Sequence, residues 1–290
     1  MKEVGFVNYI LLLLITLGTV FQSLARKEYN TKTGNCAFTF SAASVLFALL
    51  FFLFCIKGKF SITMESFWYA VGFAVAYMVT CVSLHYAIQT GPLSLTTLFS
   101  SYSLLIPTLY GLLKCNEKVS LVLLIGIVLL MVSIFFVNIE EEGEKRITVK
   151  WVFYALLTFL GNGSCSVLQK MQQSASGGLY GNEFMVVALT VSLIGMSVFA
   201  LIVEGENIRE NLKKGIVEYA VCGLSNAVAN FLVLFLVTRL PASVMFPVIS
   251  AGGIVITTLL SIFRYHEKLS VFQHIGILLG AGSVIFLNLT

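Results

Sequence analysis

Runs of apolar residues alternate along the chain with short charged or glycine- and proline-containing stretches, ten times in all. A helix crosses the hydrocarbon core of a bilayer with about 20 apolar residues, whereas a strand of a membrane barrel shows roughly ten residues of alternating polarity. The pattern therefore predicts transmembrane helices. Their approximate ranges are 4–24, 34–56, 67–88, 92–113, 119–139, 149–168, 184–203, 215–237, 241–263 and 269–289.

Composition leads to the same class of protein. Of the 290 residues, 58% are hydrophobic and 11% are charged, and the mean hydropathy is +0.94. A soluble chain carries about a quarter charged residues, which it needs to cover a surface in contact with water. We therefore predict an all-α membrane protein of ten transmembrane helices, with no room for a sizeable aqueous domain.

The charges and cysteines exclude several partners. The net charge of +4 arises from loop residues and suits anionic lipid headgroups, so nothing favours a nucleic acid. All fourteen acids are glutamates, and none lies clearly in the middle of a span. The six cysteines are scattered singly, without a C-x-x-C pair or a histidine at ligand spacing, so we expect small buried thiols and no metal or cofactor.

The first apolar run resembles a signal peptide, because Ser23-Leu24-Ala25 precedes Arg26 at its end. The run is longer than the apolar core of such a peptide, and it has a counterpart later in the chain. We expect it to be the first transmembrane helix.

An internal repeat divides the chain. At an offset of 150, residues 117–139 match residues 267–289 at ten positions, including Glu117, Gly126 and Asn138. At an offset of 143, Gly18 and Lys27 match Gly161 and Lys170. We therefore predict two five-helix repeats, 1–143 and 144–290. Because five is odd, the second repeat enters the membrane from the opposite side, and such inverted pairs are typical of secondary transporters.

The repeated signature is Glu-Lys followed by a glycine nine residues after the glutamate, at Glu117 with Gly126 and at Glu267 with Gly276. With the stretch 86–92, Tyr-Ala-Ile-Gln-Thr-Gly-Pro, it resembles the EamA-type transporters of the drug/metabolite transporter superfamily. The resemblance implies a ten-helix carrier in the cell (plasma) membrane, with a central cavity lined mainly by helices 1, 3, 4, 6, 8 and 9. It also implies cytoplasmic termini, although the distribution of lysine and arginine favours the opposite orientation.

We expect a secondary transporter, an exporter or facilitator of small polar or amphipathic metabolites, working by alternating access between the inverted halves. The absence of a mid-span carboxylate disfavours proton exchange through such a group. A lipid-carrier flippase and a non-transporting membrane receptor or sensor are the alternatives. No H-E-x-x-H, G-x-S-x-G or aspartate dyad is present, so we do not expect an enzyme. The expected partners are the substrate, membrane lipid and, at most, a second copy in a homodimer.

Polar side chains within the spans are the candidate substrate-binding residues. Asn226 and Asn230 are four residues apart and share one helix face, which either lines the cavity or bonds helices together. Lys170 either belongs to the site or extends to the membrane surface, after a flexible turn at residues 161–164. The remaining candidates are Ser100, Ser101, Tyr102, Tyr77, Asn162, Ser164 and Ser250.

Two prolines and three glycines are candidates for hinges or packing. Pro107 and Pro247 fall inside predicted spans, where each removes a backbone hydrogen bond, and Pro247 is the better hinge candidate. Gly126 belongs to the repeated signature, and Gly276 and Gly280 form a G-x-x-x-G that permits close helix packing within the chain or between copies.

Overall fold

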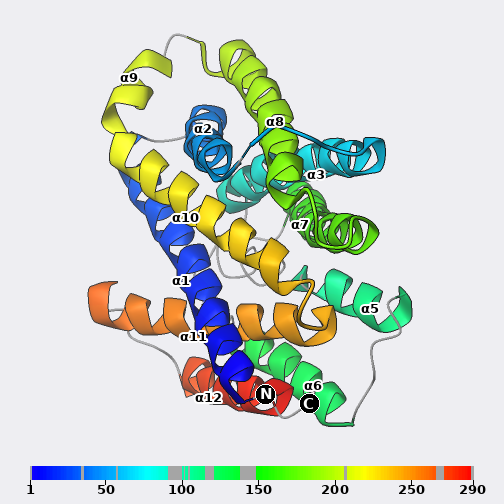
Figure 1. The fold of residues 1–290 in the computed structure, drawn as a ribbon. Helices are drawn as coiled ribbons and strands as arrows, with labels where there is room; N and C mark the ends of the chain where they lie inside the picture. Colours follow the sequence, from blue (N-terminus) through cyan, green and yellow to red (C-terminus); the bar gives the residue numbers. More distant parts are fainter. Residues whose placement is uncertain are drawn as a thin grey trace. The chain divides into compact units, whose positions relative to one another are not determined.

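The computed structural model describes residues 2–33, 36–56, 58–90, 100, 102–103, 105–114, 121–137, 148–205, 208–265 and 271–288. The regular elements of this part of the chain are helices (Figure 1). They are α1 (Lys2–Thr33), α2 (Ala37–Cys55), α3 (Met64–Thr90), α5 (Leu105–Lys114), α6 (Leu121–Val137), α7 (Val149–Ala175), α8 (Gly181–Val203), α9 (Ile208–Lys214), α10 (Ile216–Leu236), α11 (Ala242–Tyr265) and α12 (Val271–Asn288).

Six of the helices, namely α1, α2, α3, α7, α8 and α10, are long and apolar enough to cross a membrane. Large apolar side chains on them, such as Phe54, Phe153 and Leu201, are exposed, as expected where a helix faces lipid rather than water. The prediction of an all-α membrane protein is confirmed.

The helices differ from the prediction in number and extent. Eleven are described instead of ten, because α9 forms in the loop before α10, where seven mostly polar residues carry no apolar run. Helix α1 continues to Thr33 and α7 to Ala175, beyond the ends of the apolar runs. The expected turn at residues 161–164 is wrong, since α7 passes through it as unbroken helix.

The chain forms two compact units, which we call unit 1 and unit 2. Unit 1 comprises Met1–Leu17, Ser83–Val167 and Arg239–Thr290, and unit 2 comprises Gly18–Val82 and Leu168–Thr238. Each unit contains segments of both predicted repeats, and α1, α3 and α7 contribute residues to both units. The repeat boundary at residue 143 stays a prediction about sequence symmetry.

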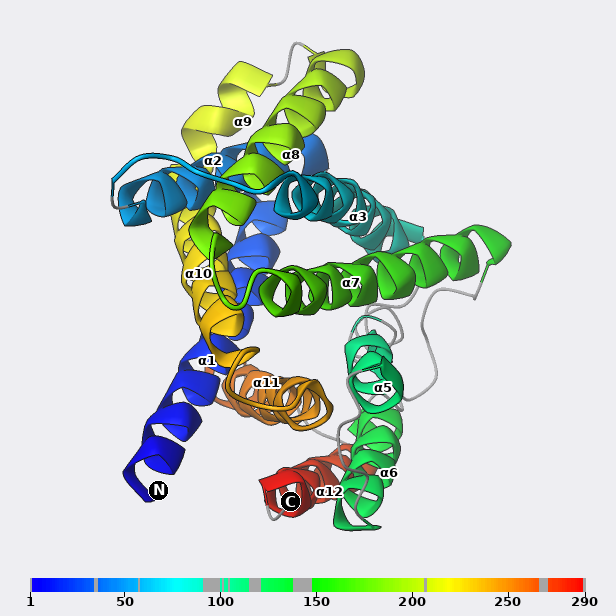
Figure 2. The same ribbon diagram turned by 45° about the vertical axis from the view of Figure 1, so that its right-hand side comes forward.

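Within unit 1, the helices that carry the repeated signature pack against each other. Helix α12 lies along α6 and α11, and α11 also contacts α5 (Figure 2). The Ser133 hydroxyl of α6 donates to the Gly276 carbonyl oxygen of α12 at 2.6 Å, and the rings of Phe136 and Phe272 stack with centroids 6.0 Å apart. The buried Gly276 and Gly126 thus serve packing within the chain.

Within unit 2, α2 packs against α8, α9 and α10. Gly223 of α10 makes this packing possible, because a Cβ atom there would lie 2.2 Å from the Ser44 carbonyl oxygen of α2. The cores of this packing contain Phe40 with Tyr219, and Phe38 with Met196. A glycine is therefore required for the backbones to approach this closely.

Helices α1 and α10 of unit 2 run antiparallel in a fixed register. A Cβ atom at Gly18 would lie 3.3 Å from Ala229, and further along α1 the rings of Tyr29 and Tyr219 lie 5.4 Å apart. At the end of α1, the Lys32 ammonium forms an ion pair with Glu218. Residue numbers rise along α1 as they fall along α10. These contacts therefore determine which side chains of the two helices face each other between Gly18 and Lys32.

Candidate functional site

A chain of hydrogen-bonded amides connects three helices of unit 2. The Asn226 Nδ2 group of α10 donates to Gln22 Oε1 of α1 at 3.0 Å. One turn along α10, Asn230 Nδ2 donates to Asn226 Oδ1 at 3.1 Å, and Gln169 Nε2 of α7 donates to Asn230 Oδ1 at 2.7 Å. We call Gln22, Asn226, Asn230 and Gln169 the amide chain.

The amide chain keeps hydrogen-bonding capacity. A primary amide has two N–H donors and two acceptor lone pairs, whereas the bonds among the described residues use one donor and one acceptor of Asn226, and one donor of Gln169. The side chains of Gln22, Asn226 and Asn230 are only half-buried, and Gln169 is buried. The amide chain can therefore offer donors and acceptors to an uncharged polar group.

Lys170, next to Gln169 on α7, is buried rather than extended to the membrane surface. Its ammonium donates to the Val237 carbonyl oxygen at 3.0 Å, at the C-cap of α10. A cation stabilises a helix C-terminus, where the last carbonyl groups carry partial negative charge. The alternative that it extends to the membrane surface is not favoured, because α7 extends five residues further and the end of α10 supplies an acceptor.

A second amide cluster at the end of α7 is structural. Gln172 Nε2 donates to the Leu179 carbonyl oxygen at 3.1 Å and to the Ser66 hydroxyl at 3.3 Å, while Gln172 Oε1 accepts a bond from Gln173. Gln172 is fully buried. These bonds hold α3 and the turn after α7. They use most of the hydrogen-bonding positions of Gln172, whereas the side chains of the amide chain keep such positions open.

The candidates in unit 1 form a separate group. Asn162 Nδ2 of α7 donates to the Ser103 hydroxyl at 2.6 Å, and Ser103 in turn donates to the Ser100 carbonyl oxygen. Tyr102 and Ser164 are half-buried, and Ser250 is buried in α11. Ser101 lies outside the described residues.

The prolines take different places in their helices. Pro107 lies in the first turn of α5, where a missing N–H costs little, so it does not interrupt that helix. Pro247 is buried in the second turn of α11, inside the helix. Gly280 is buried in α12, and its carbonyl oxygen accepts a bond from the Ser283 hydroxyl at 2.7 Å.

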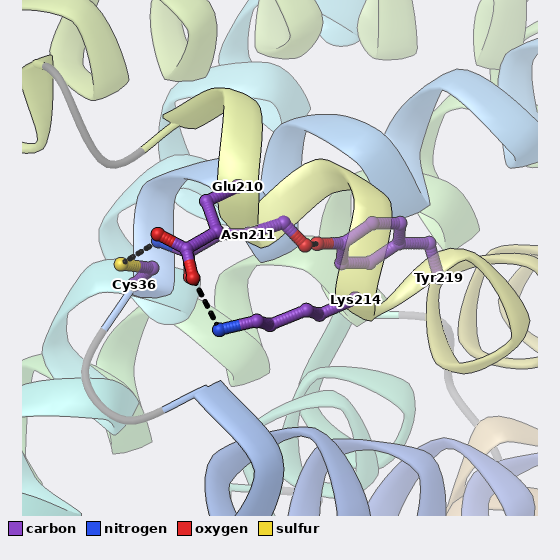
Figure 3. Close-up of polar contacts among 5 residues, drawn as sticks. All are labelled: Cys36, Glu210, Asn211, Lys214 and Tyr219. Carbon is purple, nitrogen blue, oxygen red and sulfur yellow. Dashed lines mark hydrogen bonds and ion pairs between the residues drawn. The ribbon is translucent and has the colours of Figure 1, made fainter.

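A polar cluster at the ends of two spans joins α9 to the start of α2 and to the first turn of α10, as Figure 3 shows. Asn211 Nδ2 donates to the Cys36 sulfur at 2.6 Å, and the Asn211 carbonyl oxygen accepts the Tyr219 hydroxyl. Nearby, the Glu204 carboxylate accepts the backbone N–H groups of Phe38 and Thr39 at 2.7 and 2.9 Å, and thus caps α2.

Two ion pairs lie in this region, Lys214 with Glu210 and Lys32 with Glu218. The Lys214 ammonium, bonded to Glu210, lowers the pKa of that carboxyl group, and the hydrogen bond to Glu218 raises the pKa of Lys32. Burial, followed by the charge of Glu204, raises the pKa of the Cys36 thiol. These contacts anchor helix ends and do not create a binding site.

Sequence reasoning identified half of the amide chain. It missed Gln169 because the predicted span ends at residue 168, so this glutamine falls just outside the residues considered as polar groups within spans. Gln22 lies inside the first apolar run. A polar amide at such a position indicates a binding residue, so the sequence alone could have suggested Gln22.

Tyr77 of α3 lies in unit 2, stacked on Phe73 with ring centroids 5.9 Å apart.

Comparison with known proteins supports a membrane carrier. Residues 149–289 match the EamA-like transporter family. No curated protein matches the chain. A solved structure described only as "Crystal structure of protein" superposes with a TM-score of 0.75 over 96% of this chain and 95% of that one, at 11% identity. This structural likeness shows a shared fold.

Proposed function

We propose that the chain, whose residues 149–289 match the EamA-like transporter family, is a secondary transporter, an exporter or facilitator, of small polar or amphipathic metabolites. The amide chain is the observation that carries the proposal. Amides that bond one another can serve only as links between helices, but Gln22, Asn226 and Asn230 are half-buried and keep open hydrogen-bonding positions, which fits contact with a solute. In this proposal the substrate bonds to the open positions of Gln22, Asn226 and Asn230.

Alternating access between the two inverted halves is part of the proposal. The predicted repeats supply the inverted symmetry that such carriers use. Helices α1, α3 and α7 each contribute residues to both compact units. We propose the plasma membrane as the location.

The experiment compares small molecules in cells and medium with and without the full-length protein, by untargeted mass spectrometry. Wild-type protein is expected to change the distribution of specific solutes. Asn226→Ala and Asn230→Ala should each reduce this flux by about twofold to tenfold, the effect of one lost hydrogen bond, at near-normal abundance in the membrane. Val228→Ala, on the exposed face of α10, is the matched control.

Three results would count against the proposal. If no solute changes with wild-type protein, transport itself is refuted. If both asparagine variants transport like wild type, α10 does not belong to the site. If the protein moves only lipids across a bilayer, the flippase alternative replaces a carrier of small polar solutes.

A further inference from the structure

A guanidinium group that forms no ion pair with any described residue lies one helical turn from the amide chain. Arg26 follows Gln22 by four residues on α1, so the two side chains share a helix face and stand about 6 Å apart along the axis. On α10, Cys222 precedes Asn226 by the same spacing. The antiparallel register of α1 and α10 thus places Arg26 opposite Cys222, where Gln22 faces Asn226.

The described neighbours of Arg26 that the contacts name are uncharged. Its Cζ atom lies 5.8 Å from the centre of the Phe40 ring, and electrostatic interactions connect it with the thiols of Cys81 and Cys222 and with the Tyr77 hydroxyl. Thiols and phenols are neutral near pH 7. The nearest acid along α10, Glu218, is bonded to Lys32 instead. Among the described residues, no carboxylate forms an ion pair with Arg26.

Arg26 also differs from an arginine that extends to the membrane surface. It is the last residue of the first candidate span, but α1 continues for seven more residues, and the guanidinium packs against a ring of α2. A surface arginine would place its head group in water. A partly buried charged group among uncharged neighbours at the end of a candidate span is costly, and it indicates a function with a specific partner.

We propose that Arg26 binds the carboxylate of the transported solute, and that the substrates are small monocarboxylates. The planar guanidinium matches a carboxylate with two parallel hydrogen bonds. A single unbalanced positive charge suits a solute with one negative charge better than a phosphate dianion. The Tyr77 hydroxyl, beside Arg26, and the amides of Gln22 and Asn226, one turn away, then serve the uncharged polar part of the same solute. This proposal rests on the proposed transport function and specifies its substrate class.

The test uses the full-length protein and its variants in cells, with untargeted mass spectrometry of cell and medium. Wild-type protein is expected to redistribute monocarboxylates in preference to matched neutral or cationic solutes. Arg26→Gln should reduce that flux by about tenfold or more, since hydrogen bonds to charged groups are the strong ones. Arg209→Gln, which removes an exposed charge on α9, is the matched control and should transport like wild type.

A second variant separates binding from folding. Arg26→Lys keeps the charge without the planar fork, so the preference for carboxylates should remain while the flux falls. Membrane abundance and thermal unfolding in detergent are measured for both variants. A purely structural arginine would change abundance or unfolding temperature but would leave the ratio of carboxylates to neutral solutes unaltered.

The outcomes are distinguishable. Redistribution of monocarboxylates that depends on Arg26 supports the proposal. Redistribution of cations, neutral solutes or phosphorylated solutes, or of monocarboxylates at the wild-type rate in Arg26→Gln, overturns the substrate class and leaves transport intact. If wild-type protein redistributes no solute, the transport function fails, and the assignment of Arg26 fails with it.

Discussion

The two compact units bury polar side chains in different ways. In unit 1, hydroxyl groups bond to nearby acceptors: Thr158 donates to the Tyr154 carbonyl four residues back, and Ser133 donates to the Gly276 carbonyl. Unit 2 also contains such hydroxyls, for example Ser192, which bonds to the Ala188 carbonyl four residues back. Only in the described part of unit 2 do amides form a chain across three helices, next to an unbalanced guanidinium.

The difference follows from the number of hydrogen-bonding positions. A hydroxyl on a helix can donate to the carbonyl four residues back, so burying it needs no partner from another helix. A primary amide has four positions, and its own helix satisfies few of them. Buried serine and threonine are therefore weak indicators of a binding site in a membrane protein, whereas facing amides are stronger ones.

The largest expected effect is the difference in stability between two glycine substitutions, one in each unit. In Gly223→Ala the new Cβ would lie 2.2 Å from the Ser44 carbonyl oxygen, so α10 must move away from α2. Overpacking of this kind destabilises by about 1–3 kcal/mol. In Gly282→Ala of α12 the Cβ meets no atom of the described residues within 4 Å, so stability should be unchanged or slightly higher.

Thermal unfolding of both purified variants in detergent measures this contrast. Gly223→Ala should unfold at a lower temperature than wild type, and Gly282→Ala should not. Equal unfolding temperatures for the two variants would show that α2 and α10 do not pack as closely as described.

A smaller effect is expected at Asn162. Asn162→Ala removes the bond to the Ser103 hydroxyl in unit 1, which should lower the free energy of unfolding by about 0.5–1.5 kcal/mol. Flux should stay near the wild-type level, in contrast to Asn230→Ala. The flux assay and thermal unfolding are run on both variants. If Asn162→Ala lost as much flux as Asn230→Ala at normal abundance, the restriction of the site to unit 2 would be refuted.

The smallest effect concerns reactivity outside the spans. Because the pKa of Cys36 is raised from its ordinary value of 9.0, less thiolate is present at pH 8, and alkylation by iodoacetamide should need a higher pH. Glu204→Gln removes the nearby negative charge, so it should lower the pKa and speed the reaction. Mass spectrometry of the peptide containing Cys36 measures the rate. An identical pH profile in wild type and Glu204→Gln would exclude this charge as a cause.

Much of the fold could be predicted because the bilayer imposes a simple rule. Each backbone group must be bonded inside its own segment, so long apolar runs have to be helices. The rule failed for segments that are polar and nevertheless helical. Helix α9 is short and mostly polar, and the last turns of α1 and α7 are polar yet helical, because Lys32 pairs with Glu218 and Lys170 bonds to the end of α10.

The sequence by itself determined the membrane class, the family resemblance and a helix face with Asn226 and Asn230, since these depend on composition and local periodicity. Only the tertiary structure decided which side chains meet. Gln22 and Gln169 lie 204 and 61 positions from their partners, and no local pattern encodes such a pairing. The same holds for Arg26. Among the described residues no carboxylate pairs with it, because the register between α1 and α10 pairs Glu218 with Lys32 instead.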